Sequence, residues 1–321
     1  MSLHPAVAAV RLAVRRALGH VDPGRTVVVA CSGGADSLAL LAATVFEGRH
    51  AGWRVVGATV DHGLQPGSAD HAARVVRQMA ALGADETVGA TVHVEADGLG
   101  PEAAARRARY AVLDEIGERF SAEVVLLGHT RDDQAETVLL GLARGSGGRS
   151  LAGMRRSFDR FARPLLDLSR ADTVTACQVE GIEFWSDPHN EDPAFTRVRV
   201  RRSVLPVLED QLGPGVAEAL ARTADQLRED MDLLDDAAEA AYERLPDLPV
   251  DGLLAEPGPI RRRVLRLAAL AAGAPASELF HEHVLAMDAL LTHWHGQKWV
   301  DLPGKVRCRR GDGRLHLDRA G

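Results

Sequence analysis

Apolar residues follow two different periods in the first half of the chain. Short continuous apolar runs lie at 26–31, 54–61, 90–95 and 123–129, and the segments between them carry apolar residues every three or four positions. The runs are typical of buried strands and the segments of helices. Strands that alternate with helices form parallel sheets covered on both faces. The pattern therefore predicts an α/β fold with a doubly wound, mostly parallel sheet.

A different pattern begins near residue 216. Apolar residues repeat at spacings of three or four from Val216 to Tyr242, which predicts one long amphipathic helix. Two shorter helices are expected at 259–272 and 277–291, and the alternating segment at 305–318 surrounds a Gly-Asp-Gly turn. Such a turn between alternating runs is typical of a hairpin. This part is therefore predicted to be mainly helical and to end in a hairpin.

A chain of 321 residues exceeds the usual size of a single domain. The tripeptide Gly-Pro-Gly at 213–215 directly precedes the long helix. Because glycine and proline interrupt regular structure, we expect two domains, at 1–215 and 216–321. We expect Trp294 and Trp299 to lie in the core of the second domain.

Composition narrows the class of protein. The three cysteines, Cys31, Cys177 and Cys308, are dispersed, so neither a disulfide framework nor a thiolate zinc site is indicated. No apolar run approaches membrane-spanning length, and we expect a cytoplasmic protein without a secretion signal. The net charge of -7 argues against indiscriminate nucleic-acid binding, but three arginine clusters favour an anionic partner over solvated helix faces. They lie at 106–110, 197–202 and 261–266.

A polar turn, Ser-Gly-Gly-Ala-Asp-Ser at 32–37, joins the first apolar run to a helical segment. Gly33 and Gly34 allow backbone N–H groups to approach a phosphate, and Ser32 and Ser37 add hydroxyl donors at a helix N-terminus. The turn matches neither the Walker pattern GxxxxGK nor the Rossmann pattern GxGxxG. A glycine-rich turn without a ligand is the alternative, but the added serines and aspartate favour a phosphate site.

Two further polar segments follow predicted strands: Asp-His-Gly-Leu-Gln at 61–65 and Gly-His-Thr-Arg-Asp-Asp-Gln-Ala-Glu-Thr at 128–137. Because the carboxyl ends of parallel strands lie at one edge of a sheet, we expect both segments beside the first turn. Asp133 and Glu136 are three apart and share one face of a helix. Paired carboxylates suit a magnesium ion or a substrate ammonium group. The alternative for an isolated aspartate pair is a helix cap, which is the commoner role. The alternative for His129, taken by itself, is a buried structural histidine.

The turn at 32–37 resembles the nucleotide loop of the PP-loop ATP pyrophosphatases. Together with the segments at 61–65 and 128–137, it resembles the tRNA(Ile)-lysidine synthase family. The resemblance continues through four segments, at 102–110, 144–147, 163–166 and 185–206. The last of these matches the family pattern W..D..N.d....R.R.R....P, including Asp187 and Asn190, whereas Gln65 replaces an arginine that is common in the family. The part after 215 resembles compact members with one tRNA-binding domain.

The resemblance implies an enzyme that modifies the wobble cytidine of the isoleucine tRNA whose anticodon is CAU. ATP adenylates the 2-carbonyl oxygen of the base, pyrophosphate leaves, and the amine of free L-lysine attacks to give lysidine and AMP. The base would leave the anticodon stack to reach the site. The implied cofactors and partners are ATP, Mg²⁺, free L-lysine and isoleucine tRNA, without a membrane, and a homodimer is compatible with the family.

Roles follow from the resemblance by position. The implied ATP-binding residues are Ser32, Gly33, Gly34, Asp36, Ser37, Asp61, His62 and His129. Asp36, Asp133 and Arg106 are the implied catalytic residues, with Asp36 as a magnesium ligand and with Asp133 and Glu136 binding lysine. The candidates for ATP or tRNA phosphate contacts are Arg109, Arg197, Arg199 and Arg201, with Arg106 as a further one. Candidates for tRNA backbone contacts in the second domain are Arg261, Arg262, Arg263 and Arg266, for which a solvated helix face is equally compatible.

Three alternatives remain open. A PP-loop tRNA thiolase also adenylates a base, but such enzymes usually need a cysteine pair or an iron–sulfur cluster. An amidotransferase-type synthetase would need a glutaminase domain. A nucleotide-binding module without catalysis would not need Asp36, Asp133 and Glu136 together, and ATP–pyrophosphate exchange distinguishes it.

Overall fold

The computed structural model describes residues 3–61, 63, 67–92, 101–145, 147–185 and 191–319, with the side chains of 101–103 and 105 excepted. The motif residues His62, Gln65, Asp187 and Asn190 lie outside this described part. Contacts divide the chain into two compact units. Unit 1 comprises Met1–Arg144 and Gly153–Ala224, and unit 2 comprises Gly145–Ala152 and Asp225–Gly321. The long helix α10 (Val216–Arg244) contributes residues to both units.

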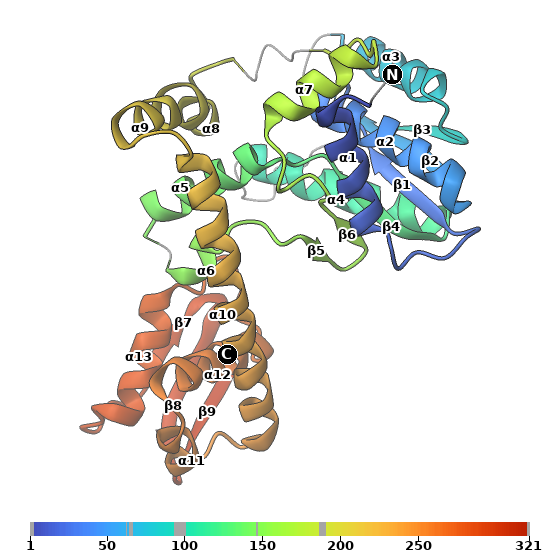
Figure 1. Ribbon diagram of the computed structural model, residues 1–321. Coiled ribbons are helices and arrows are strands. Elements are labelled where there is room, and N and C mark those ends of the chain that lie inside the picture. The colour runs from blue at the N-terminus through green and yellow to red at the C-terminus, as the bar shows by residue number, and fades with distance from the viewer. Residues whose placement is uncertain are drawn as a thin grey trace. The chain divides into compact units, whose positions relative to one another are not determined.

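Unit 1 is built on a six-stranded sheet with the strand order β3-β2-β1-β4-β6-β5 (Figure 1). Neighbouring strands are parallel except for β5 and β6, which form a short antiparallel hairpin. The strands are β1 (Thr26–Ala30), β2 (Arg54–Asp61), β3 (Glu86–Thr91), β4 (Ala122–Leu127), β5 (Ser157–Phe158) and β6 (Phe161–Ala162). The predicted α/β class with a mostly parallel sheet is confirmed.

Helices cover both faces of this sheet. The helical elements of unit 1 that precede α10 are α1 (Pro5–Ala17), α2 (Ala35–Ala51), α3 (Ser68–Ala81), α4 (Pro101–Arg119), α5 (Arg131–Ala143), α7 (Arg170–Val179), α8 (Thr196–Arg199), the π-helical turn η2 (Val200–Val204) and α9 (Leu205–Leu212). Those that pack against the strands are α1, α2, α3 and α7 on one face and α4 on the other, whereas α5, η2 and α9 share a separate small cluster. Val27 and Val29 of β1 pack in a cluster with α1, α2, α3 and α7, whereas Val28 and Ala30 pack in a cluster with α4. Alternate β1 residues therefore face opposite layers, as a strand buried on both faces requires.

The third strand lies earlier in the chain than its predicted position at 90–95. Strand β3 spans Glu86–Thr91 and pairs with β2 in the register Val56↔Glu86 to Asp61↔Thr91. It is the edge strand next to β2, and none of its residues is fully buried. A partly exposed edge strand has no need for a continuous apolar run, so the hydrophobic pattern misplaced it.

Unit 2 has its own core beneath a three-stranded antiparallel sheet. Its elements are α6 (Gly148–Leu151), the end of α10, α11 (Val250–Ala255), α12 (Gly258–Ala271), α13 (His281–Thr292), β7 (Val300–Leu302), the 3₁₀ turn η3 (Pro303–Lys305), β8 (Val306–Gly311) and β9 (Arg314–Arg319). The predicted terminal hairpin is β8–β9, and β7 adds a strand that was not predicted. Val264, Met287 and Cys308 are among its fully buried residues.

The two C-terminal tryptophans lie at the surface of unit 2, so their predicted burial in the core is wrong. Trp294 is 49% exposed and Trp299 is 45% exposed. The Arg310 guanidinium lies 4.6 Å from the ring centroid of Trp294, and that of Arg307 lies 4.8 Å from that of Trp299. Cation–π contacts of this kind hold both rings at the surface while each keeps one face partly solvated.

The α12 arginines contact groups within unit 2. Arg261 forms an ion pair with Asp288 at 2.6 Å, Arg263 forms one with Asp235 at 2.8 Å, and Arg266 donates to the carbonyl oxygen of Leu279 at 2.5 Å. For these three arginines the contacts stabilise the packing of unit 2 and argue against a merely solvated helix face, whereas Arg262 donates to the Gly258 carbonyl oxygen of its own helix. Contact with tRNA backbone remains a prediction for these residues. No helix in the described part of the chain is long and apolar enough to cross a membrane.

Candidate active site

The turn at 32–37 connects β1 to α2 and is closed by one hydroxyl group. Ser37 Oγ donates to the carbonyl oxygen of Gly34 at 3.0 Å and accepts from the Ser32 N–H at 3.2 Å. Gly34 is the N-cap of α2, and no side chain caps the helix there. The first N–H groups of a helix have no intrahelical partner, so this end of α2 can bind an anion.

The two glycines of the turn differ in their backbone conformation and in the space around them. Gly33 has a φ of 84°, and a Cβ atom at this position would lie 2.7 Å from Val75 Cγ2. Gly34 has a φ of -78°, and the nearest atom to an added Cβ would be Ser32 Oγ at 3.6 Å, an ordinary van der Waals distance. The fold therefore requires glycine at 33. At 34 the protein itself has room for a methyl group, which leaves space for a ligand.

Asp36 lies in the first turn of α2 and is 23% exposed. Burial raises its pKa to about 6, and the neighbouring carboxylates of Asp133 and Asp132 add to this rise. The Thr173 hydroxyl, which donates to Asp36, and the Arg170 guanidinium oppose the rise only in part. The neighbouring residues therefore offset the burial of this carboxylate only in part, which suits the binding of a cation.

The segment after β4 lies directly against the turn at 32–37. A Cβ atom on Gly128 would lie 3.0 Å from the Ser37 nitrogen, so the two backbones approach closely. This contact follows from the topology, because β1 and β4 are neighbours and Ala30 pairs with Leu127. Two of the three predicted loops therefore meet where the strand order reverses, which is the usual ligand position in such sheets. Asp61 of the third loop ends β2 at the same edge.

Asp133 and Glu136 lie on α5 and are both buried, with side-chain exposures of 12% and 0%. The Asp133 carboxylate accepts from the Thr130 N–H at 2.8 Å and from the Thr130 hydroxyl at 3.0 Å, so it also caps the helix. Burial alone would raise the pKa of Asp133, but Arg170, the Thr130 N–H and Arg197 lower it. Asp133 is therefore anionic, and its second oxygen faces the site.

Arg170 links all three site carboxylates and was not predicted. It begins α7, and its guanidinium lies 2.9 Å from Asp133 Oδ1, 3.5 Å from Glu136 Oε1 and 3.6 Å from Asp36 Oδ2. Its backbone N–H donates to Asp132 at 2.8 Å. No local sequence pattern marks Arg170 as a site residue, because its partners lie more than thirty residues away in the sequence. The buried acids required a cation, but the sequence did not indicate which of the arginines supplies it.

Two arginines of the 197–202 cluster complete the charge balance of Glu136. Arg201 contacts both Glu136 oxygens, at 2.7 and 3.1 Å, and Arg197 lies 3.1 Å from Oε2. Arg199 instead donates to carbonyl oxygens of its own segment, those of Pro193 and Ala194. The segment forms α8 and η2, so positions 197 and 201 share one helical face and position 199 lies elsewhere.

A second group of arginines surrounds His129. Arg163 is 6% exposed, donates to Tyr110 Oη at 3.1 Å and lies 3.3 Å from His129 Nδ1. Arg106 donates to the same phenol oxygen at 3.2 Å, and burial lowers the pKa of Arg109. Burial lowers the pKa of His129 to about 3, and the arginine charges add to this effect, so the imidazole is neutral. Arg163 belongs to the segment at 163–166, and the sequence alone did not indicate its contact with His129.

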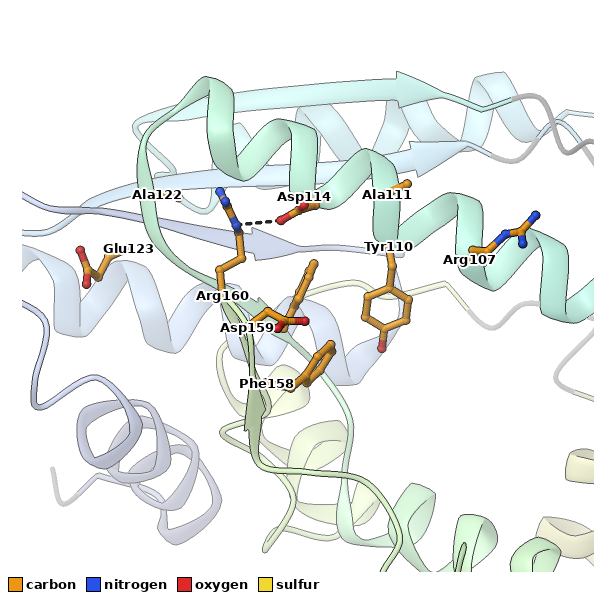
Figure 2. A pocket seen from close by; sticks show the side chains of 10 residues that line it. Arg107, Tyr110, Ala111, Asp114, Ala122, Glu123, Phe158, Asp159 and Arg160 are labelled. Carbon is orange, nitrogen blue, oxygen red and sulfur yellow. Dashed lines mark ion pairs between the residues drawn. The ribbon is translucent and has the colours of Figure 1, made fainter. Parts of the chain in front are cut away.

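A groove of unit 1 lies away from these residues. Its volume is about 800 Å³, and it runs between α4 and the β5–β6 hairpin (Figure 2). Tyr110 and Phe158 line it, with ring centroids 5.9 Å apart, and Arg160 forms an ion pair with Asp114 beside them. Ala122 at the start of β4 also lines it, whereas the carboxylates follow the other end of this strand. We assign this groove no role in the site.

The cysteines are buried free thiols. Burial raises the pKa of Cys31, Cys177 and Cys308 to about 12 each. Because the thiolate is the reactive form and the metal ligand, these side chains are poorly suited to sulfur transfer or to cluster binding.

Comparison with known proteins identifies the class of this domain. A family model described as the PP-loop domain matches residues 9–208, and one described as the TilS substrate binding domain matches residues 248–316. The U34-tRNA thiolase NcsA from Methanococcus maripaludis, solved with its 4Fe-4S cluster, has the same fold. The TM-score is 0.59 at 17% identity, over 70% of this chain and 80% of that one. The sheet and the turn at 32–37 therefore belong to a PP-loop ATP-binding domain.

Relatives along nearly the whole chain narrow the class to one family. The tRNA(Ile)-lysidine synthase of Thermobifida fusca is 55% identical over 315 residues, which cover 97% of both chains. That of Streptomyces coelicolor is 50% identical over 98% of this chain and 99% of its own. The chain belongs to the tRNA(Ile)-lysidine synthase family, whose members are PP-loop ligases of tRNA modification. The resemblance noted from the three sequence motifs is confirmed.

Proposed function

We propose that this protein ligates free L-lysine to the wobble cytidine of the CAU anticodon of isoleucine tRNA. ATP would activate the base as an adenylate, with release of pyrophosphate, and the lysine amine would displace AMP. The observation that carries this proposal is the buried pair Asp133 and Glu136, which lies beside Asp36 and the phosphate-binding turn. Such a pair places a site for a cationic substrate next to a site for a nucleotide.

The nucleotide phosphates would bind at the amino end of α2. The N–H groups that follow Gly34 and the Ser32 hydroxyl are donors there, and Asp36 lies in the same helical turn. Magnesium in nucleotide sites usually has one or two carboxylate ligands, with the remaining positions taken by phosphate and water. Asp36 fits this role because its carboxylate is short of positive charge. Bound Mg²⁺ would offset the negative charge that develops on the leaving pyrophosphate.

Lysine would bind where guanidinium groups now contact the carboxylates. Arg201 and Arg197 are 24% and 30% exposed, so both are at the edge of the site rather than sealed within it. A lysine ammonium can replace one of these cations without leaving a buried carboxylate unpaired. The arginine that it releases could then contact phosphates of ATP or tRNA. Asp133 and Glu136 would select a cationic amino acid and orient its amine.

The remaining arginines suit a polyanionic substrate. Arg106 is exposed at the edge of the group around His129, and Arg199 is exposed on α8. We propose that these two, with Arg109, contact tRNA phosphates near the extruded base. Unit 2 would contact another part of the tRNA. A tRNA thiolase remains the alternative, and the buried thiols of this chain argue against it.

The experiment that tests the proposal is incorporation of labelled lysine into an unmodified isoleucine tRNA transcript with a CAU anticodon, in the presence of ATP and Mg²⁺. We expect lysine in the tRNA and an equal amount of AMP. If AMP forms but no lysine is incorporated into the tRNA, the adenylation step stands and lysine is rejected as the second substrate. Absence of both products would reject the proposed function.

The turn offers a test of where ATP binds. Gly34→Ala should fold, since the added methyl group meets nothing closer than 3.6 Å and alanine at an N-cap costs only about 1 kcal/mol. ATP binding should weaken by at least about tenfold, because the methyl group takes the space that a phosphate would need. Calorimetric titration with ATP and Mg²⁺ measures this effect.

The neighbouring glycine is the matched control. Gly33→Ala places its methyl group 2.7 Å from Val75 and forces a positive φ on alanine, so it should lower the stability of the fold itself. Unchanged ATP affinity in a folded Gly34→Ala variant would contradict the proposed position of the phosphates.

A further inference from the structure

The carbonyl groups of the nucleotide-binding turn are held from outside by two residues. His71 of α3 places its Nε2 atom 2.9 Å from the carbonyl oxygen of Ser32. The backbone N–H of Trp185 donates to the carbonyl oxygen of Gly33 at 2.9 Å. Because Nε2 faces a carbonyl oxygen, it carries the proton and donates. Two consecutive peptide groups of the turn are thus fixed by hydrogen bonds from residues far away in the sequence.

Fixing these carbonyl groups also fixes two N–H groups. In a trans peptide the C=O of one residue and the N–H of the next point in opposite directions. The Ser32 carbonyl shares its peptide group with the Gly33 N–H, and the Gly33 carbonyl shares its own with the Gly34 N–H. With both carbonyl oxygens directed at His71 and Trp185, the two N–H groups point to the other side of the turn. Neither donates a hydrogen bond to another residue in the described part of the chain.

His71 and Trp185 also pack against each other. The His71 and Trp185 rings are in contact, with centroids 3.9 Å apart and an angle of 39° between their planes. His71 Nδ1 is buried and has no hydrogen-bond partner among the described residues, so packing and the Nε2 bond alone fix the ring. Val75, one turn further along α3, lies against Gly33 from the same side. One face of α3 and Trp185 therefore form a rigid support beneath the turn.

We propose that His71 and Trp185 are positioning residues of the nucleotide site, which direct the N–H groups of Gly33 and Gly34 toward the phosphates of ATP. This inference rests on the proposed function, in which the turn binds ATP. Neither residue touches the substrate, so their effect is on the orientation of donors that the backbone supplies. Such donors are effective only when they are oriented before the ligand binds.

The test compares ATP binding to the full-length wild-type protein and to His71→Leu, His71→Gln and Gln78→Leu variants, by titration with ATP and Mg²⁺. His71→Leu removes the bond to Ser32 and should weaken ATP binding by about tenfold. The glutamine amide can take the place of Nε2, so His71→Gln should bind within about threefold of wild type. In the ligation assay, His71→Leu should raise the KM for ATP and leave the KM for lysine unchanged.

Gln78 is the matched control because it also lies on α3 and donates to a backbone oxygen, that of Glu183 at 3.0 Å, but does not contact the turn. Gln78→Leu should bind ATP like wild type. Equal weakening by Gln78→Leu, or wild-type affinity in His71→Leu, would overturn the inference. If His71→Leu does not fold, Trp185→Leu, which keeps the backbone N–H but removes the ring contact, must weaken ATP binding for the inference to stand. Failure of the wild-type protein to bind ATP would instead reject the proposed function.

Discussion

An Asp36→Asn variant is expected to lose AMP formation and lysine ligation by about 10²–10³-fold, a range typical for removal of one electrostatic contact to a transition state. The carboxylate lies in the first turn of α2 beside the turn at 32–37, where in the proposed function it would hold Mg²⁺ against the phosphates. Asparagine retains the oxygen that accepts from Thr173 but carries no charge. AMP release from ATP, measured with tRNA and lysine present, gives the size of the loss.

The same variant should be no less stable than wild type in metal-free buffer with EDTA. Burial raises the pKa of Asp36 from 3.8 to about 6, so its ionised form destabilises the fold above pH 6. The uncharged asparagine avoids this penalty, which is at most roughly 3 kcal/mol for a shift of about two units. The advantage of the variant should be full at pH 8, shrink as the pH falls through 6 and vanish below 3.8. Urea unfolding at pH 8 and pH 5 measures it.

Asp70→Asn provides the control for these two measurements. Asp70 is also an aspartate in the first turn of a helix, but it is exposed. Its loss should leave activity unchanged and should lower stability by only a few tenths of a kcal/mol through the helix dipole. Asp36→Asn with activity within tenfold of wild type would contradict the catalytic role. Lost activity together with lost stability would indicate a structural role instead.

The hydrophobic pattern predicted the α/β half well because its central strands are buried on both faces. Val27 to Val29 are fully buried on a strand with neighbours on each side, so every position is apolar. Where burial is partial, as in β3, the pattern failed. It also gave no sign that Gly145–Ala152 belongs with unit 2. That membership depends on contacts such as the ion pair of Arg149 with Asp235, which lies far along the chain.

The acidic half of the site could be predicted and the basic half could not. Asp133 and Glu136 are close in sequence and lie on one helix, so their spacing places them together. Arg170 reaches them from another helix, and only the folded chain brings it there. The cluster at 197–202 was recognised, but the sequence did not show which of its arginines contact the carboxylates. The helical segment α8–η2 directs Arg197 and Arg201 to Glu136 and leaves Arg199 outside.

An Asp133→Asn variant should raise the KM for lysine by about a hundredfold and leave formation of the tRNA adenylate largely intact. Loss of one charge-assisted hydrogen bond to an ammonium group costs about 1.5–3 kcal/mol, and the upper part of this range corresponds to that factor. Asparagine can still accept from Thr130, so the helix cap is retained. Asp133 is a better choice than Glu136, whose loss would leave Arg170, Arg197 and Arg201 without their shared partner. Lysine titrations at saturating ATP and tRNA measure the change.

An Asp172→Asn variant distinguishes an effect of lost helix capping from an effect on the lysine site. Asp172 caps α7 in the same way, since its carboxylate accepts from the Ser169 N–H at 2.9 Å and from the Ser169 hydroxyl at 2.6 Å. Among the described residues, the ion pairs of Arg170 and Arg201 involve other carboxylates, so replacement of Asp172 should cost some stability and leave the KM for lysine unchanged. If both variants raise this KM equally, helix capping explains the effect. If Asp133→Asn instead abolishes adenylate formation, the carboxylate acts in the first step, and the lysine site must be sought elsewhere.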